Sequence, residues 1–152
     1  MDVNIRDARP EDANVIANFN SAMALETEDH HLDPELIRAG VGSLLADHRH
    51  GRYWVAEIDG AVIGQIMVTY EFSDWRNGVI WWAQSVYVRK DMRRMGIYTS
   101  LYQHVESLAR ADESVVAIRL YVDRNNTRAQ DTYEKLGMNM TDYLIMQTEF
   151  RS

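Results

Sequence analysis

Residues 85–101 read Ser85-Val86-Tyr87-Val88-Arg89-Lys90-Asp91-Met92-Arg93-Arg94-Met95-Gly96-Ile97-Tyr98-Thr99-Ser100-Leu101, an apolar strand pattern that changes into a basic turn and then into a helix. The backbone N–H groups at a helix start point in one direction and carry about half a positive charge from the helix dipole. Gly96 allows a close backbone approach, and Arg89, Lys90, Arg93 and Arg94 supply local positive charge in a chain of net charge −7. The segment therefore predicts a site for an anion such as a diphosphate.

Two common phosphate loops are excluded. No glycine is followed by Lys-Ser or Lys-Thr, as a P-loop requires, and the G-x-G-x-x-G pattern of dinucleotide-binding folds is absent. The remaining pattern is R-x-x-G-x-[G/A], which residues 93–98 match except that Tyr98 stands where a small residue is usual. About thirty residues further on, the sequence reads Asn126-Thr127-Arg128-Ala129-Gln130-Asp131-Thr132-Tyr133-Glu134-Lys135-Leu136-Gly137-Met138. This second segment fits N-x-x-A-x-x-x-Y-x-x-x-G-[F/M], a short helix closed by a glycine C-cap.

These two segments, in this order, resemble the acyl-CoA pyrophosphate loop and the following helix of the GNAT superfamily of N-acetyltransferases, and the resemblance covers the whole chain. It implies a single α/β domain over residues 1–152, the GNAT fold. Such a domain has a mixed central sheet of about six to seven strands with flanking helices, in the order β-α-α-β-β-β-α-β-α-β. The implied activity moves an acetyl group from acetyl-CoA to a primary amine of a small-molecule or protein acceptor, by direct attack in a ternary complex.

The resemblance also assigns a cofactor site. The loop that would hold the acetyl-CoA pyrophosphate comprises Arg93, Arg94, Met95, Gly96, Ile97, Tyr98 and Thr99. The backbone of Val86, Tyr87 and Val88 would pair with the pantetheine arm, and the Val86 N–H would face the thioester oxygen. Plain core packing is the structural alternative for Val86 and Val88.

The second segment adds Asn126, Ala129 and Tyr133 to that site. Asn126 would hydrogen-bond the cofactor arm, although capping the following helix is an equally natural role. The Tyr133 hydroxyl would lie near the sulfur, where it can protonate or hold the leaving thiolate. Without the motif, a helical tyrosine would be interpreted as an amphipathic core residue.

The general base has to be sought elsewhere. Many family members carry a glutamate where this chain has Gln84, and a glutamine cannot accept a proton at neutral pH. Glu71 and Glu26 are the candidate bases, with a water chain or plain surface charge as alternatives. For the acceptor we predict contacts with Glu26, Trp75 and Gln84. An aromatic cleft wall able to hold an ammonium group would come from Tyr70, Phe72, Trp75, Trp81 and Trp82; one of the adjacent pair Trp81 and Trp82 is expected to pack against the sheet instead.

The composition narrows the function further. The chain of 152 residues is sized for one domain. It contains 23 acidic and 16 basic residues, which argues against nucleic-acid binding. No apolar run reaches the length of a membrane span, so we expect a cytoplasmic protein without membrane contact. The chain lacks cysteine, and its paired histidines lie in polar stretches, so no metal is expected.

Periodicity and turn signals predict the elements along the chain. Strands are expected over residues 3–8, 53–58, 61–70, 79–88 and 115–122, with one or two closing strands within 138–150. Helices are expected to begin at residues 10 and 34 and to span 96–111 and 127–136, with a polar segment, 26–31, between the first two. A homodimer is possible, since dimers are common in the resembled family. The competing functions are a catalytically silent CoA-binding sensor or interaction module and, more weakly, a structural protein.

Overall fold

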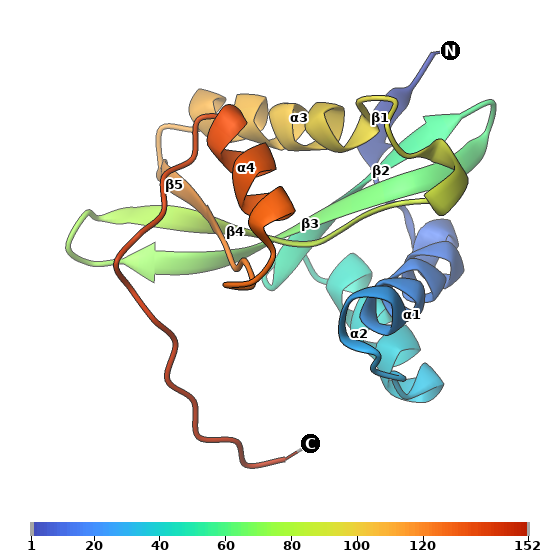
Figure 1. The fold of residues 1–152 in the computed structure, drawn as a ribbon, viewed down its shortest axis with the longest axis horizontal. Coiled ribbons are helices and arrows are strands. Elements are labelled where there is room, and N and C mark those ends of the chain that lie inside the picture. The colour runs from blue at the N-terminus through green and yellow to red at the C-terminus, as the bar shows by residue number, and fades with distance from the viewer. Residues whose placement is uncertain (1, 152) are drawn as a thin grey trace. The chain divides into compact units, whose positions relative to one another are not determined.

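A computed structural model describes residues 2–151, and the chain divides between Tyr121 and Val122 into two compact units. The first unit is an α/β sandwich, as expected (Figure 1). Its elements are, in order, β1 (Asn4–Asp7), a 3-10 turn (Pro10–Asp12), α1 (Ala13–Glu28), α2 (Pro34–Ala46), β2 (Gly51–Ile58), β3 (Ala61–Ser73), β4 (Gly78–Val88), a second 3-10 turn (Lys90–Met92), α3 (Ile97–Ala111) and β5 (Val115–Leu120).

The five strands form one mixed sheet in the order β1-β2-β3-β4-β5. The pairs from β1 to β4 are antiparallel, and β5 runs parallel to β4. Asp59-Gly60 makes the turn of the β2–β3 hairpin, with Gly60 in the left-handed conformation that such turns favour. Strand alternation then sends neighbouring side chains to opposite faces of the sheet.

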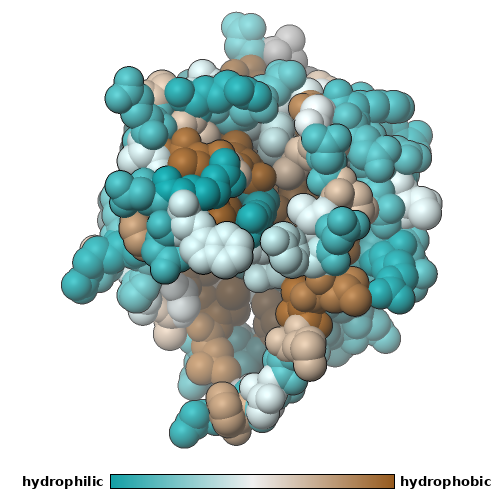
Figure 2. All heavy atoms as spheres, turned by 90° about the vertical axis from the view of Figure 1, so that its left-hand side faces the viewer, coloured by the Kyte–Doolittle hydropathy of each residue, from teal (hydrophilic) through white to brown (hydrophobic). Residues whose placement is uncertain are grey.

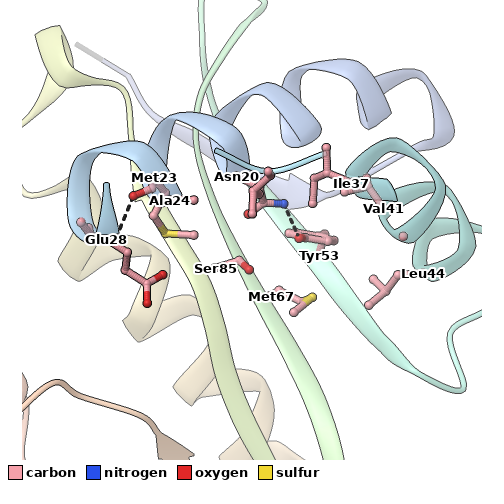
Figure 3. A pocket seen from close by; sticks show the side chains of 13 residues that line it. Asn20, Met23, Ala24, Glu28, Ile37, Val41, Leu44, Tyr53, Met67 and Ser85 are labelled. Carbon is pink, nitrogen blue, oxygen red and sulfur yellow. Dashed lines mark hydrogen bonds between the residues drawn. The ribbon is translucent and has the colours of Figure 1, made fainter. Parts of the chain in front are cut away.

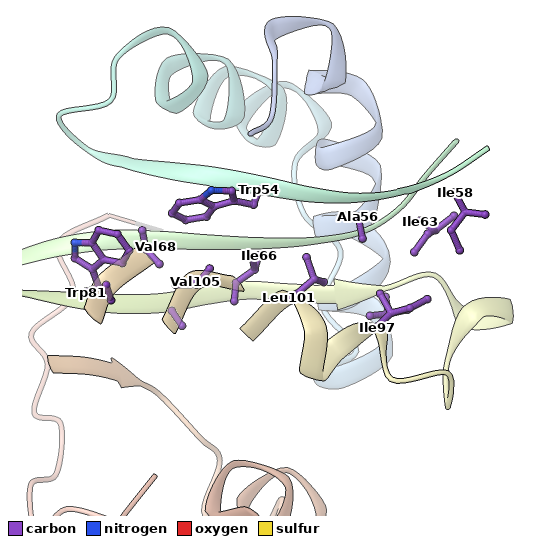
Figure 4. Close-up of a cluster of buried hydrophobic side chains, with 13 residues drawn as sticks. Trp54, Ala56, Ile58, Ile63, Ile66, Val68, Trp81, Ile97, Leu101 and Val105 are labelled. Carbon is purple, nitrogen blue, oxygen red and sulfur yellow. The ribbon is translucent and has the colours of Figure 1, made fainter. Parts of the chain in front are cut away.

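Each face of the sheet is covered by helices. Apolar residues of α3, among them Ile97, Leu101 and Val105, pack with Trp54 and Trp81 on one face (Figure 4). The side chains of α1 and α2 pack with Tyr53 and Val55 on the other face, in a second cluster that includes Ile16, Ala17 and Val41. The sequence prediction that one of two adjacent tryptophans packs in the core is confirmed, because Trp81 is buried.

The helix starts follow their sequence signals. The Asp33 side chain accepts hydrogen bonds from the backbone N–H groups of Glu35 and Leu36, and Pro34 occupies the first helical position. At the other end of the preceding helix, α1 continues to Glu28 before Asp29 turns left-handed. The predicted polar connection 26–31 is therefore partly helical, and Glu26 lies in the last turn of α1.

The second unit contains α4 (Thr127–Lys135) and the segment that follows it. The Asn126 side chain accepts a hydrogen bond from the Ala129 backbone N–H (3.0 Å), and Gly137 turns left-handed (φ 98°) beyond the helix end. The prediction of closing strands is wrong for the described part of residues 138–151, which contains no strand, so the sheet has five strands instead of six or seven. The apolar side chains from Tyr143 to Met146 are all exposed, so this segment lacks the burial that stabilises an apolar strand.

The end of the first unit that carries the β3–β4 turn faces the viewer in Figure 2, where hydrophobic side chains are interspersed among hydrophilic ones. Phe72 and Trp75 are among the exposed aromatic residues of this hairpin. Within residues 2–151, no helix is both long and apolar enough to cross a membrane.

Candidate active site

A β-bulge interrupts β4 at its C-terminal end. Gln65 pairs with Tyr87 and Met67 pairs with Gln84, so that two residues of β4, Ser85 and Val86, oppose the single residue between Gln65 and Met67. Ser85 takes a left-handed backbone (φ 51°), which is rare for a residue with a side chain. A bulge leaves the extra residue's backbone groups out of the ladder with the neighbouring strand. The bulge thus interrupts the ladder with β3 directly before Val86, whose N–H is predicted to face the thioester.

The other edge of β4 opens at the same place. The parallel ladder between β4 and β5 runs from Val79 to Ala83, where Ala83 pairs with Leu120, the last residue of β5. Beyond that pair, the described residues provide no partner strand for residues 84–88 on this side. An extended chain of amides can pair with such an edge. This is the segment that the sequence assigns to the pantetheine arm through Val86, Tyr87 and Val88.

The predicted pyrophosphate loop leads from β4 into α3. Arg94 and Gly96 both adopt left-handed backbone (φ 68° and 78°), and the Ser100 N–H donates to the Gly96 carbonyl in the first turn of the helix (3.0 Å). A Cβ placed on Gly96 would meet no atom within 4 Å, so the glycine is explained by its backbone conformation and not by crowding. Ile97 is buried and anchors the helix start, while Gly96 is exposed. The exposed Gly96 backbone therefore lies directly before the N-terminus of α3, the end at which a helix favours an anion.

The side chains of this loop are distributed between the core and the surface. Tyr98, which replaces the usual small residue, packs against the α3 side of the core. It therefore does not fill the space over the exposed Gly96 backbone. Arg89 forms an ion pair with Asp91 (2.7 Å). The side chains of Arg94 and Met95 are exposed, and that of Thr99 is partly exposed.

Glu26 connects the end of α1 to this loop. Its carboxylate accepts hydrogen bonds from the Tyr87 hydroxyl (2.5 Å) and from Arg93 Nη2 (2.8 Å), and Arg93 Nε donates to the Val88 carbonyl (2.9 Å). The Tyr87 hydrogen bond, followed by the Arg93 contact, lowers the pKa of Glu26 below its usual range. Burial and the neighbouring Glu26 carboxylate raise the pKa of Tyr87. A carboxylate held in this way is a weak proton acceptor, so the geometry favours a linking role for Glu26 over that of a base.

A pocket of about 450 Å³ lies between α1, α2 and the sheet, and Ser85 of the bulge is on its wall (Figure 3). The Tyr53 hydroxyl accepts a hydrogen bond from Asn20 Nδ2 (3.0 Å) at the inner end of this pocket. Gln65, fully buried, donates through Nε2 to both Asn20 Oδ1 (3.1 Å) and the Ser85 carbonyl (3.1 Å). This network joins the pocket wall to the bulge. Sequence analysis did not identify its residues, although polar Asn20 and Gln65 inside apolar patterns were a signal for them.

Gln84, a predicted acceptor contact, and Glu71, a candidate base, are not among the residues that line this pocket. Gln84 Nε2 donates to Thr69 Oγ1 (2.6 Å). Glu71 accepts from Trp82 Nε1 (2.9 Å) and pairs with Ile80, five positions before Ser85, which places it about 17 Å along the strand from the bulge at roughly 3.4 Å per residue. The structure therefore does not bring Glu71 to the Val86 N–H.

The predicted aromatic cleft wall is also dispersed. Trp75 is 94% exposed in the β3–β4 turn, and Trp82 stacks on Tyr121 with 4.6 Å between ring centroids. Neither residue lines the pocket beside Ser85. Among residues 2–151, no group of three or more His, Cys, Asp or Glu side chains could hold a metal ion.

Asn126, Ala129 and Tyr133 belong to the second unit, where Asn126 caps α4 and Tyr133 lies in its last turns. Burial raises the pKa of Tyr133 to about 12. The hydroxyl therefore keeps its proton at neutral pH, as a proton donor must.

Comparison with known proteins identifies the family. The model of the acetyltransferase (GNAT) family matches residues 16–138. The chain belongs to the GNAT acetyltransferases. It is 44% identical to a possible acetyltransferase from Clostridium difficile 630, with 99% of each chain covered and a TM-score of 0.94. No curated protein sequence matches it significantly.

Two more distant structures share the fold of this GNAT chain. A predicted acetyltransferase from Clostridium acetobutylicum, solved with acetyl-CoA, has a TM-score of 0.79 at 17% identity, covering 97% of this chain and 96% of that one. A ribosomal-protein-alanine N-acetyltransferase from Brucella melitensis biovar Abortus 2308 has a TM-score of 0.78 at 19% identity, covering 99% and 100%. Membership of the family makes this protein an acetyltransferase, and acetyl-CoA is the acetyl donor that the family uses.

Proposed function

We propose that this acetyltransferase moves the acetyl group of acetyl-CoA to the nitrogen of a primary amine, by direct attack while both substrates are bound. The observation that carries the proposal is the unpaired edge of β4 at residues 84–88, which lies between the bulge and the glycine loop. The edge suits an amide-containing arm, and the loop suits a diphosphate. The residues present therefore fit acetyl-CoA, which supplies the thioester carbonyl that an amine attacks.

Val86 and Tyr133 would act on the two ends of the thioester bond. The Val86 N–H donates to the carbonyl oxygen as negative charge develops there. The amine forms a C–N bond as the C–S bond breaks, and the Tyr133 hydroxyl gives its proton to the departing sulfur. The proton lost by the amine goes to water, because Gln84 cannot accept it and Glu26 is held by two donors. Asn126 and Ala129 stay predicted contacts of the cofactor arm from the family resemblance.

The acceptor would occupy the pocket between α1, α2 and the sheet. Ser85 lines this pocket and precedes Val86 directly, so an amine placed there lies beside the residue that would face the thioester. A cytoplasmic location, a single domain over residues 1–152 and a homodimer stay predictions from the family resemblance.

The test compares two glycines whose backbone φ angles are nearly equal. Gly96 and Gly60 have φ 78° and 80°, and a Cβ on either would meet no atom within 4 Å, so replacement by alanine strains both equally. We expect Gly96→Ala to weaken CoA binding at least about tenfold in calorimetry, because strain in the loop displaces the N–H groups that would hold the diphosphate. Gly60→Ala, in the β2–β3 turn, should leave CoA binding unchanged.

Thiol release from acetyl-CoA, measured with a panel of primary amines, tests turnover itself. Equal CoA affinity of the two variants would refute the loop assignment. Tight CoA binding without amine-dependent thiol release would instead favour the silent binding module.

A further inference from the structure

The residues that line the pocket beside Ser85 include few charged side chains. Of the thirteen described residues that line it, Glu28 is the one acid and none is basic. Most of the others are apolar, including Met23 and Leu32 at the α1 side and Ile37, Val41 and Leu44 of α2. Its volume of about 450 Å³ falls within the range of small-molecule sites, roughly 300–1,000 Å³. The wall can thus cover a hydrocarbon body of moderate size.

Besides Thr27 and Glu28 in the last turn of α1, the polar residues that line the pocket form one group. Tyr53, Asn20 and Ser85 make up this group, and Figure 3 shows Ser85 between the α1 residues and Tyr53. Because the Asn20 amide already donates to Tyr53 and its carbonyl already accepts from Gln65, few hydrogen-bonding positions remain for a ligand. This polar end suits one small polar group, such as an amine beside the bulge.

Charged groups elsewhere on a ligand would be poorly accommodated. A carboxylate in this pocket would find no cationic side chain among its described lining residues. A second ammonium group could reach only Glu28, at the exposed end of α1, or would lie against methionine and leucine side chains. Transfer of an unpaired charge from water to such a wall is strongly unfavourable.

From this scarcity of charged groups we infer that the acceptor is a primary amine on an apolar alkyl or aryl body, with neither a carboxylate nor a second ammonium group. The inference rests on the proposed function, since it assigns the acceptor to this pocket. It disfavours free amino acids, polyamines and aminoglycosides as acceptors. Glu28 draws the ammonium form to the rim, and the apolar wall then holds the body with the nitrogen toward Ser85.

Two matched substrate pairs test the inference directly. Phenylalanine differs from 2-phenylethylamine by a carboxylate, and 1,6-diaminohexane differs from hexylamine by an ammonium group. With the wild-type protein and saturating acetyl-CoA, we expect kcat/KM, referred to the neutral amine, to be at least about tenfold higher for 2-phenylethylamine and for hexylamine than for their charged partners. Spermidine completes the panel as a polyamine.

Two variants test whether the pocket holds the acceptor. Gly40 lines the pocket and Gly42 does not, yet both lie in α2 and both have open space around an added Cβ. Leucine at either position improves helix propensity, so neither substitution threatens folding. Gly40→Leu should raise the KM for 2-phenylethylamine about tenfold, the scale expected when hydrocarbon is excluded from an apolar site, with the KM for acetyl-CoA unchanged. Gly42→Leu should resemble the wild type.

The results distinguish failure of the inference about the acceptor from failure of the proposed function. Preference for phenylalanine, the diamine or spermidine, or equal KM values for the two leucine variants, would overturn the inference while leaving amine acetylation intact. Absence of thiol release with every amine would overturn the proposed function and this inference together. Higher rates for the two monoamines, with the selective Gly40→Leu effect, would support it.

Discussion

Ser85 holds a left-handed backbone inside a strand, whereas such residues as Asp59 and Asn77 hold it in turns. For a residue with a side chain this conformation costs on the order of 1–3 kcal/mol. The hydrogen bond from buried Gln65 to the Ser85 carbonyl helps to maintain it. Strain retained beside an unpaired strand edge is typical of functional sites, and it supports the assignment of catalysis to the bulge.

The hydroxyl oxygen of Tyr133 is the atom that we predict to act on the leaving sulfur. Tyr133→Phe should lower kcat by about 100- to 10,000-fold, the range for general acids, with the lower end expected because the CoA thiol is fairly acidic. The affinity for acetyl-CoA should stay near the wild-type value, since the ring is retained. Steady-state kinetics with a circular dichroism check provide the measurement, and Tyr143→Phe, an exposed tyrosine of the same unit, is the control. A wild-type kcat would remove Tyr133 from catalysis.

Helix α1 is the element that touches both predicted substrate sites. Its last turns line the pocket through Met23, Ala24 and Thr27, and Glu26 of the same turns binds Arg93 of the loop. A diphosphate on the loop would compete with the Glu26 carboxylate for Arg93. The two sites are thus joined through one side chain.

This connection predicts the effect of neutralising the helix end. Glu26→Gln should tighten CoA binding by about two- to fivefold, the size of a partly exposed charge interaction, because a negative charge beside the phosphate site is removed. Calorimetry measures it, and Glu28→Gln makes the same charge change two residues away without a contact to Arg93. If Glu26 were the base, the substitution would instead lower kcat many-fold with little change in CoA affinity.

At the scale of the first unit, an ion-pair network joins segments distant in sequence. Arg6 of β1 binds Asp12 of the first 3-10 turn (2.8 Å) and Glu57 of β2 (3.0 Å). Burial raises the pKa of Asp12, but the hydrogen bonds from Arg6 and from the Arg9 backbone N–H lower it more, so the net shift is downward. A carboxyl group whose folded-state pKa is depressed stabilises the fold above its unfolded pKa of about 4 and loses that contribution as pH falls.

Asp12→Asn should therefore reduce the free energy of unfolding by about 1–3 kcal/mol at neutral pH, since Arg6 loses a buried partner. The difference from the wild type should shrink below about pH 4, where the wild-type carboxyl becomes protonated. Urea unfolding at a series of pH values measures this, with Asp7→Asn as the exposed control. A loss of stability independent of pH would show that the Asp12 charge is not responsible.

Sequence alone determined the features that depend on neighbours within a few positions. The start of α2 at Pro34, the start of α3 after Gly96 and the Asn126 cap of α4 were predicted, because each is a local backbone requirement met by one or two residues. The motif that identified the family is local in the same sense.

Tertiary structure decided everything that needed partners far apart in the chain. The open edge of β4 depends on where β5 stops, and the Glu26–Arg93 ion pair joins residues 67 positions apart. The pocket combines Asn20, Tyr53 and Ser85 from three separate elements, and the apolar run at 143–146 stays exposed and forms no strand, although its residue types favour one. Local patterns specify which conformation a segment prefers, but strand partners and site geometry are set by the summed packing of distant segments, which no short stretch encodes.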